Sequence, residues 1–226
     1  VIDGRHVPYR AAAELQQLAP AASLQRAVDF QRLVASRRSV RFFSDRAVDI
    51  DVVRACVRAA ATAPSGANCQ PYFFVIVSSA AVKREVRKIV EEEERVNYER
   101  RMGAQWLEHL KPLGTTWRKP YLETAPHLVL VFQQPHGVDE HGKRVTHYYP
   151  QISAGIACGM LVTAIHNAGL CTLTSTPMNC GAALKRLLRR PTHEKLMLLL
   201  PVGYAAADAT VPNIARKPYD AVCSEC

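Results

Sequence analysis

The sequence predicts one mixed α/β domain, and three observations support this fold class. Residues 72–77, 127–133 and 195–202 are rich in β-branched, leucine and aromatic side chains, which is typical of buried strands. Helical periodicity marks the segments between and around them. No internal repeat or low-complexity tract interrupts the chain, and its 226 residues, 48% hydrophobic, are enough to bury a substantial core.

The first third of the chain predicts an arm and two helices. Residues 1–22 contain two prolines and little periodicity, so we expect an extended arm or linker before a single domain over 23–226. Ser23 is a suitable N-cap for a helix that runs to about residue 35. A second helix is expected from Asp49 or Asp51 to about residue 63, with acidic residues at its start. It ends at a proline–serine–glycine turn over 64–66, where glycine lets the backbone approach a ligand closely.

The rest of the chain predicts a long charged helix over 81–101, followed by a cover. Trp106 and Trp117 fall in a stretch broken by Pro112 and Gly114, so we expect a lid at about 91–120. The acidic run 91–94 by itself is typical of a solvated face. We further expect a loop over 135–146, a helix over 149–168 with small residues at a close helix contact, a strand over 171–175 and a short basic helix over 182–190.

Charge and cysteine content narrow the class of protein. The net charge of +9 and the pI near 9.4 favour anionic partners. Seven cysteines, an odd number in a chain too large to need disulfides, predict reduced thiols. The longest apolar region, 152–165, is too short to cross a bilayer, so we expect a soluble domain. The scattered histidines predict no metal site.

Three polar features are candidates for ligand binding. Residues 36–41 (SRRSVR) place three guanidinium groups within five residues, and guanidinium groups match phosphate oxygens. The turn 64–67 and the hydroxyl-rich segment 174–176 could hold a flat heterocycle. A solvated basic surface or an anion- or nucleic-acid-binding module remains the alternative, and the residues alone do not decide between them.

The chain also resembles a known family at several motifs. The segments 36–41 (SRRSVR), 63–71 (APSGANCQP), 91–103 (EEEERVNYERRMG), 174–181 (TSTPMNCG) and 190–204 (RPTHEKLMLLLPVGY) are similar to the iodotyrosine deiodinases, members of the nitroreductase-like flavoprotein superfamily. So are Trp117 to Lys119 and residues 121–126. The likeness runs in one order over nearly all of 36–217. Its first two segments are shared with general nitroreductases, whereas the acidic block and Lys119 are specific to the deiodinases.

This resemblance implies a nitroreductase-like fold, with a central mixed sheet flanked by helices in an intertwined homodimer, and FMN at the subunit interface. By position, the FMN phosphate and ribityl chain would be held by Arg37, Arg38, Ser39, Val40, Arg41 and Arg216. The isoalloxazine would lie against Pro64, Ser65 and Gly66 and along Thr174, Ser175 and Thr176. The Thr176 hydroxyl would approach flavin N5 and favour single-electron steps over hydride transfer, so Thr176 and Ala67 are the predicted catalytic residues.

The same resemblance implies a halogenated tyrosine as substrate. Glu94 and Tyr98 are four residues apart on one helical face, and with Lys119 they would bind the amino-acid zwitterion, while the Ala67 N–H would meet the phenolate. The implied reaction is reductive dehalogenation of mono- and diiodotyrosine, with NADPH or a reductase as electron source and no nucleic acid. Animal members carry an N-terminal membrane anchor, so the full-length protein is expected to be anchored. The alternative is an NAD(P)H-dependent nitroreductase or flavin reductase that acts on nitroaromatics or quinones.

Overall fold

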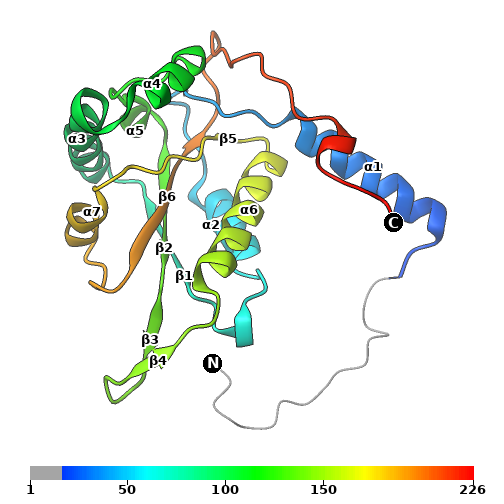
Figure 1. The fold of residues 1–226 in the computed structure, drawn as a ribbon, viewed down its shortest axis with the longest axis horizontal. Coiled ribbons are helices and arrows are strands. Elements are labelled where there is room, and N and C mark those ends of the chain that lie inside the picture. The colour runs from blue at the N-terminus through cyan, green and yellow to red at the C-terminus, as the bar shows by residue number, and fades with distance from the viewer. Residues whose placement is uncertain (1–16) are drawn as a thin grey trace.

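A computed structural model describes residues 17–226, and its centre is a four-stranded sheet in the order β1–β2–β6–β5 (Figure 1). Neighbouring strands pair antiparallel. A parallel bridge between Ser39 and Thr172 adds the basic stretch beside β5, which makes the sheet mixed, as predicted. The strands are β1 (Tyr72–Val77), β2 (His127–Gln133), β5 (Cys171–Thr172) and β6 (Lys195–Gly203).

Helices cover both faces of this sheet. Helices α2 and α6 lie on one face, and α3, α5 and α7 lie on the other (Figure 1). The helices are α1 (Pro20–Ser36), α2 (Ile50–Ala60), α3 (Ala80–Val96), α4 (Ala104–Leu110), α5 (Tyr121–Thr124), α6 (Pro150–Asn167) and α7 (Gly181–Leu187). Short turns of other helix types are η2 (Gly66–Asn68), η3 (Asn97–Arg101), η4 (Lys111–Leu113) and η5 (Tyr219–Ala221).

Strand β2 is buried on both faces of the sheet and contributes side chains to the hydrophobic cluster on each face. Its residues alternate between two hydrophobic clusters, with Leu128 and Leu130 facing α3 and α7, and Val129 and Val131 facing α2 and α6. All four side chains are fully buried. A strand buried on both faces shows a continuous apolar run, which is the pattern that predicted it.

Helix α1 begins earlier than predicted and packs little. Pro20 occupies its first turn, where the fixed backbone of proline suits a helix start, so Ala19 rather than Ser23 is the N-cap. The predicted arm over 1–22 therefore ends before Pro20, and its residues 1–16 lie outside the described residues. No residue of α1 is buried, and Leu24 and Phe30 are exposed to 68% and 56%. Leu24 and Phe30 are thus largely uncovered within residues 17–226, although α1 contacts α6 through Leu33 and Ser36.

The long helix predicted over 81–101 is confirmed with one change of geometry. Asn97 begins a π-helical turn that continues to Arg101, directly after α3. The cover that follows consists of α4 and η4 and ends in an irregular segment up to Lys119. Figure 1 shows α3 and α4 meeting at one end of the sheet, and lid residues line a cavity together with the segment after β5.

Two segments differ from the sequence prediction. The loop predicted over 135–146 contains a small hairpin of β3 (His136–Val138) and β4 (Arg144–Thr146), joined by a turn in which Gly142 has a φ of 78°. The strand predicted over 171–175 is regular only at Cys171 and Thr172, because Leu173 and Thr174 leave the ladder before Ser175 bridges Leu199.

Two further expectations, the cap of α2 and the free cysteines, agree with the structure. Asp49 accepts a hydrogen bond from the Asp51 N–H and caps α2, as its acidic start predicted. All seven cysteines are free, as predicted. Among the helices of residues 17–226, none has the length and apolar character that a bilayer crossing requires.

Candidate active site

A cavity of about 190 Å³ lies where the lid meets the end of β5. It is enclosed by α3, the π-helical turn, the lid and the segment after β5. Its lining combines charged, hydroxyl and aromatic groups with apolar lid residues, and comprises Arg41, Glu94, Tyr98, Met102, Trp106, Leu110, Leu113, Thr115, Lys119, Tyr121, Leu173, Thr174, Ser175, Thr176 and Met178. All three predicted zwitterion-binding residues are therefore in one cavity with the predicted hydroxyl segment.

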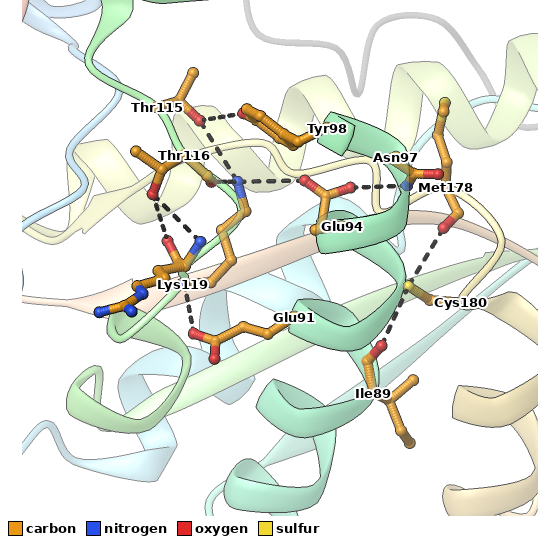
Figure 2. A network of polar contacts seen from close by, with 11 residues as sticks. Ile89, Glu91, Glu94, Asn97, Tyr98, Thr115, Thr116, Lys119, Met178 and Cys180 are labelled. Carbon is orange, nitrogen blue, oxygen red and sulfur yellow. Dashed lines mark hydrogen bonds and ion pairs between the residues drawn. The ribbon is translucent and has the colours of Figure 1, made fainter. Parts of the chain in front are cut away.

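Glu94 and Lys119 form a buried ion pair within this cavity. Their carboxylate and ammonium groups lie 3.3 Å apart, and both side chains are more than nine-tenths buried (Figure 2). Burial lowers the pKa of Lys119, and the Glu94 carboxylate opposes that shift. Removal of one partner of such a pair would leave an uncompensated buried charge, so any ligand must satisfy both groups.

Tyr98 and the lid backbone complete the surroundings of Lys119. The ammonium lies 5.5 Å from the centre of the Tyr98 ring and donates to the Thr116 carbonyl at 2.6 Å. The Tyr98 hydroxyl is 3.2 Å from the Thr115 hydroxyl, and burial raises the Tyr98 pKa. The Tyr98 ring, the Glu94 carboxylate and the Lys119 ammonium thus converge. They match the ring, the ammonium and the carboxylate of an aromatic amino acid.

Glu91 has a role that the sequence did not indicate. Its carboxylate accepts a hydrogen bond from the backbone N–H of Lys119 at 2.6 Å (Figure 2). It also accepts one from the Arg87 guanidinium at 2.8 Å. The interpretation of Glu91 as part of a solvated face is therefore wrong, because it fixes the end of the lid to α3. No spacing rule finds this contact, since 28 residues separate the two partners.

The segment after β5 presents its hydroxyls to the same cavity. Thr174, Ser175 and Thr176 all line it, and Thr176 also lines a second cavity of about 640 Å³ that extends toward α7 and β6. Tyr121 lies beside them, and burial raises its pKa well above the ordinary value. Thr176 is thus accessible from both cavities.

The basic stretch divides its guanidinium groups among different partners. Burial, then Arg216, then Arg38 lower the pKa of Arg37, so these cations lie near one another. Arg38 also donates to the Ala35 carbonyl at the end of α1, and Arg41 lines the 190 Å³ cavity. Within residues 17–226, none of the four has an ion pair with an acidic side chain. Neighbouring cations without an acid favour an anionic ligand.

The backbone anchors this stretch beside the hydroxyl segment. The Val40 N–H donates to the Thr172 carbonyl at 3.2 Å, and Ser39 bridges the same residue. Thr174 stands two residues after Thr172, so the basic stretch and the hydroxyls adjoin. The predicted phosphate and ring-edge residues are therefore parts of one surface.

The turn over residues 64–67 lies elsewhere. Its first three residues line a separate cavity of about 400 Å³ with Tyr149, Ile152, Ser153 and Ile156, at the start of α6. A Cβ at Gly66 would come within 2.8 Å of the Tyr148 carbonyl oxygen, so this glycine is required by a backbone contact within the chain. Ala67 has a φ of 48°, and Asn68 and Gln70 have similar positive values. This left-handed backbone conformation costs free energy in residues other than glycine.

These two groups of predicted residues are separated by the length of α6. The turn packs at the N-terminal end of α6, whereas Ser36, the first residue of the basic stretch, contacts His166 at the C-terminal end. Figure 1 shows the course of α6 between them. Eighteen helical residues span about 27 Å. Of the predicted residues, the 190 Å³ cavity is lined by Arg41, Glu94, Tyr98, Lys119, Thr174, Ser175 and Thr176. Ser39 and Val40 contact Thr172 close by, and Arg37 lies near Arg38 and Arg216. Pro64, Ser65, Gly66 and Ala67 lie apart from this cavity.

Comparison with known proteins identifies the class of protein that this fold and site define. Residues 34–204 match the Nitroreductase family, and the chain belongs to that family. Among solved structures, a BluB-like flavoprotein from Clostridium difficile 630 shares the fold with a TM-score of 0.65 at 20% identity, covering 87% of this chain and 98% of its own. The predicted nitroreductase-like fold is confirmed.

Within that class the chain belongs to the iodotyrosine deiodinase family. It is 52% identical over 199 residues to iodotyrosine deiodinase 1 of Homo sapiens, covering 88% of this chain and 69% of the relative. It is 50% identical over 212 residues to iodotyrosine deiodinase of Danio rerio, covering 94% and 70%. The crystal structure of oxidized iodotyrosine deiodinase bound to FMN and 3-iodo-L-tyrosine superposes with a TM-score of 0.72 at 29% identity, covering 84% of this chain and 96% of that chain.

Proposed function

We propose that this protein is an FMN-dependent enzyme that removes iodide from mono- and diiodotyrosine. The observation that carries this proposal is the buried Glu94–Lys119 pair, with Tyr98 beside it, in one cavity with the Thr174–Thr176 hydroxyls. A nitroaromatic or a quinone carries no ammonium and no carboxylate, so the predicted nitroreductase alternative leaves this pair without a purpose. The solved relative with FMN and 3-iodo-L-tyrosine supports the same assignment.

The residues of the basic surface fit the FMN phosphate. Arg37, Arg38 and Arg216 are neighbouring cations without an acidic partner among the described residues, and a phosphate dianion would relieve their mutual repulsion. Ser39, Val40 and Arg41 would follow the ribityl chain toward the hydroxyl segment. Thr174, Ser175 and Thr176 would line the ring edge, with Thr176 nearest flavin N5.

The cavity is suited to the two charges of an amino acid. The substrate ammonium would pair with Glu94 and its carboxylate with Lys119, while Tyr98 covers the ring. One buried ion pair is thereby replaced by two, so neither protein group loses its partner. Closure of the lid over these contacts excludes water from the reacting ring.

The reaction that these groups would serve is a reductive substitution. When bound, reduced FMN would supply the two electrons that, with one proton, replace the carbon–iodine bond by carbon–hydrogen and release iodide. The Ala67 N–H would donate to the phenolate oxygen and help the ring reach the keto form that can expel iodide. Ala67 and Thr176 thus have the two roles closest to the chemistry.

A second copy of the chain would complete the site. Because the turn over 64–67 lies at the opposite end of α6 from the phosphate-binding surface, one chain cannot apply both to one flavin. A two-fold dimer across the exposed faces of α1 and α6 would bring each turn to the other chain's cavity. Exposed Phe30, Ile152 and Ile156 supply apolar area for such an interface.

Two further parts of this proposal rest on the family alone. NADPH, acting through a reductase partner, is the proposed ultimate source of electrons. The full-length protein is proposed to carry an N-terminal membrane anchor, following the animal pattern, and this chain spans about 69% of the human relative's length.

Substrate choice tests the proposal directly. The purified protein should be yellow with bound flavin. After reduction with dithionite, it should release iodide from 3-iodotyrosine rapidly and from 2-iodophenol hardly at all, because only the amino acid engages both charges. Iodide is measured after a single anaerobic turnover. Equal turnover of the two compounds would refute the role of the ion pair, and colourless protein that refuses added FMN would refute the proposal as a whole.

A further inference from the structure

Asn97 is a buried polar side chain at the junction between α3 and the π-helical turn. It has no exposed surface, and it lies three residues after Glu94 (Figure 2). Its amide nitrogen donates to the Glu94 carboxylate at 3.3 Å. Its amide oxygen accepts from Arg101 at 3.1 Å and from Asn179 at 3.4 Å. Both ends of the amide are therefore used.

These partners fix the orientation of the amide. Arg101 and Asn179 approach with N–H donors, so they require the oxygen of Asn97 on their side. The Glu94 carboxylate is acceptor-only when ionised, so it requires the nitrogen. A flipped amide would oppose donor to donor and acceptor to acceptor. Asn97 is thus a link of fixed direction between Glu94 and the segment that carries Asn179.

The two oxygens of Glu94 have different partners. One faces the Lys119 ammonium at 3.3 Å, and the other accepts from Asn97. When Lys119 turns to the carboxylate of a substrate, the first oxygen becomes free for the ammonium. The second keeps its bond to Asn97, so the carboxylate does not rotate away.

Asn179 extends this link to the other side of the cavity. It lies three residues after Thr176 and has a φ of 64°, a left-handed conformation that asparagine tolerates well. Met178, between them, lines the cavity. Asn97 therefore joins the residue for the substrate ammonium to the segment at the ring edge.

We propose that Asn97 is a positioning residue that holds Glu94 ready for the substrate ammonium and ties it to the Thr176 segment. This inference rests on the proposed function and deepens it. It assigns substrate selectivity to a residue that touches neither substrate nor cofactor.

Two substitutions of Asn97 separate positioning from folding. Asn97→Leu removes the donor to Glu94, and Asn97→Asp replaces it with a second carboxylate of nearly the same shape. At about pH 8 both should weaken binding of 3-iodotyrosine by about tenfold to a hundredfold, the effect of one hydrogen bond to a charged group. Quenching of the flavin fluorescence measures the affinity. Binding of 2-iodophenol, which lacks the zwitterion, should change little.

Acid should rescue the aspartate variant alone. Two adjacent carboxylates share a proton once the pH falls below the raised pKa of one of them, and the protonated group is again a donor. At about pH 5.5 the ratio of wild-type to Asn97→Asp affinity should shrink, whereas the ratio for Asn97→Leu should not. Gln105→Glu, an exposed change on α4 with the same change in charge, is the control and should show neither effect.

Asn179→Gly provides a milder test, because glycine accepts the left-handed backbone and removes only the amide. It should weaken 3-iodotyrosine binding less than the Asn97 variants and leave 2-iodophenol binding unchanged. Wild-type affinity in all three variants would overturn the inference. So would a loss of both ligands in equal measure without recovery in acid. Failure of the proposed function is distinct, since the wild-type protein would then bind no 3-iodotyrosine.

Discussion

At the scale of residues, the free protein already neutralises its own recognition groups. Glu94 and Lys119 pair with each other, and Asn97, Thr116 and the Tyr98 ring surround them. A ligand with only one charge would replace one partner and leave the other group buried and unpaired. Selectivity for a zwitterion therefore follows from the pair itself.

Thr176 is the residue whose hydroxyl is expected to act on the flavin. Thr176→Ala should lower the fraction of one-electron-reduced flavin during anaerobic titration with dithionite, because the donor to flavin N5 is lost. Visible absorbance during the titration measures this fraction. Thr174→Ala removes a neighbouring hydroxyl in the same cavity and should leave it unchanged. An unaltered fraction in Thr176→Ala would contradict the role of this hydroxyl.

The sequence predicted these residues unevenly. Glu94, Tyr98 and Lys119 all come from the family resemblance, and the i, i+4 spacing of the first two agrees with it. Asn97, in the same block, stands at i+3 from Glu94, so helical spacing could have found it. Asn179 could not be found in this way, because its contact with Asn97 joins positions 82 residues apart.

At the scale of elements, the lid is held at one end by α3. Glu91 accepts the Lys119 N–H, and the Arg87 guanidinium on α3 supports the same carboxylate and also reaches Glu123 on α5. The other end of the lid continues from α3 through the π-helical turn. The lid is thus attached to one helix at both ends, with its aromatic side chains between them.

Removal of this attachment should loosen the lid without touching the cavity lining. Glu91→Ala deprives a part-buried N–H of its acceptor, at a cost of about 1–3 kcal/mol. We expect weaker binding of 3-iodotyrosine and faster tryptic cleavage after Arg118, which is exposed. Glu92→Ala, on the exposed face of the same helix, is the control. Equal cleavage rates in the wild-type protein and Glu91→Ala would rule out this attachment.

Elements with a long hydrophobic pattern in the sequence were predicted well. Elements that depend on short strand pairing or on a change of helix type were not. Strand β2 and helix α3 have long apolar patterns that local physics dictates. The β3–β4 hairpin was missed because each strand has three residues, and its polar turn resembles an ordinary loop. The π-helical turn was missed because α- and π-helical turns share the same residue types.

At the scale of the whole molecule, exposed apolar side chains gather on α6 and the neighbouring part of α1. Ile152 and Ile156 project from α6 at exposures of 63% and 41%, and Phe30 of α1 lines a neighbouring groove with Gly159. Among residues 17–226, nothing lies within 4 Å of a Cβ added at Gly155 or Gly159. Small residues without an internal neighbour are typical of a helix against which another subunit packs.

A charge at this surface should separate the subunits. If the proposed dimer forms through this surface, Ile152→Asp is expected to leave a monomer and to abolish retention of FMN, because the turn of the second copy is lost. Light scattering after size-exclusion chromatography gives the mass, and absorbance gives the flavin content. Val138→Asp, an exposed apolar position on the β3–β4 hairpin, should change neither. A monomeric variant that keeps its FMN would show that one chain suffices.

The sequence predicted the fold of the whole molecule but not the distance between the 64–67 turn and the basic stretch. The turn over 64–67 and the basic stretch are both readable as motifs, and the resemblance assigned them to one cofactor. Only the three-dimensional course of α6 shows that they lie at opposite ends of a helix. Composition and spacing contain no information about this separation.

The position of the 64–67 turn has a consequence for how the protein behaves on dilution. If each flavin is held by groups from two chains, the cofactor is a ligand of the assembled pair and not of the single chain. By mass action, added FMN should then shift association toward the dimer, and dilution should release flavin and subunits together. The concentration of protein in the cell would thereby set how much of it carries a cofactor.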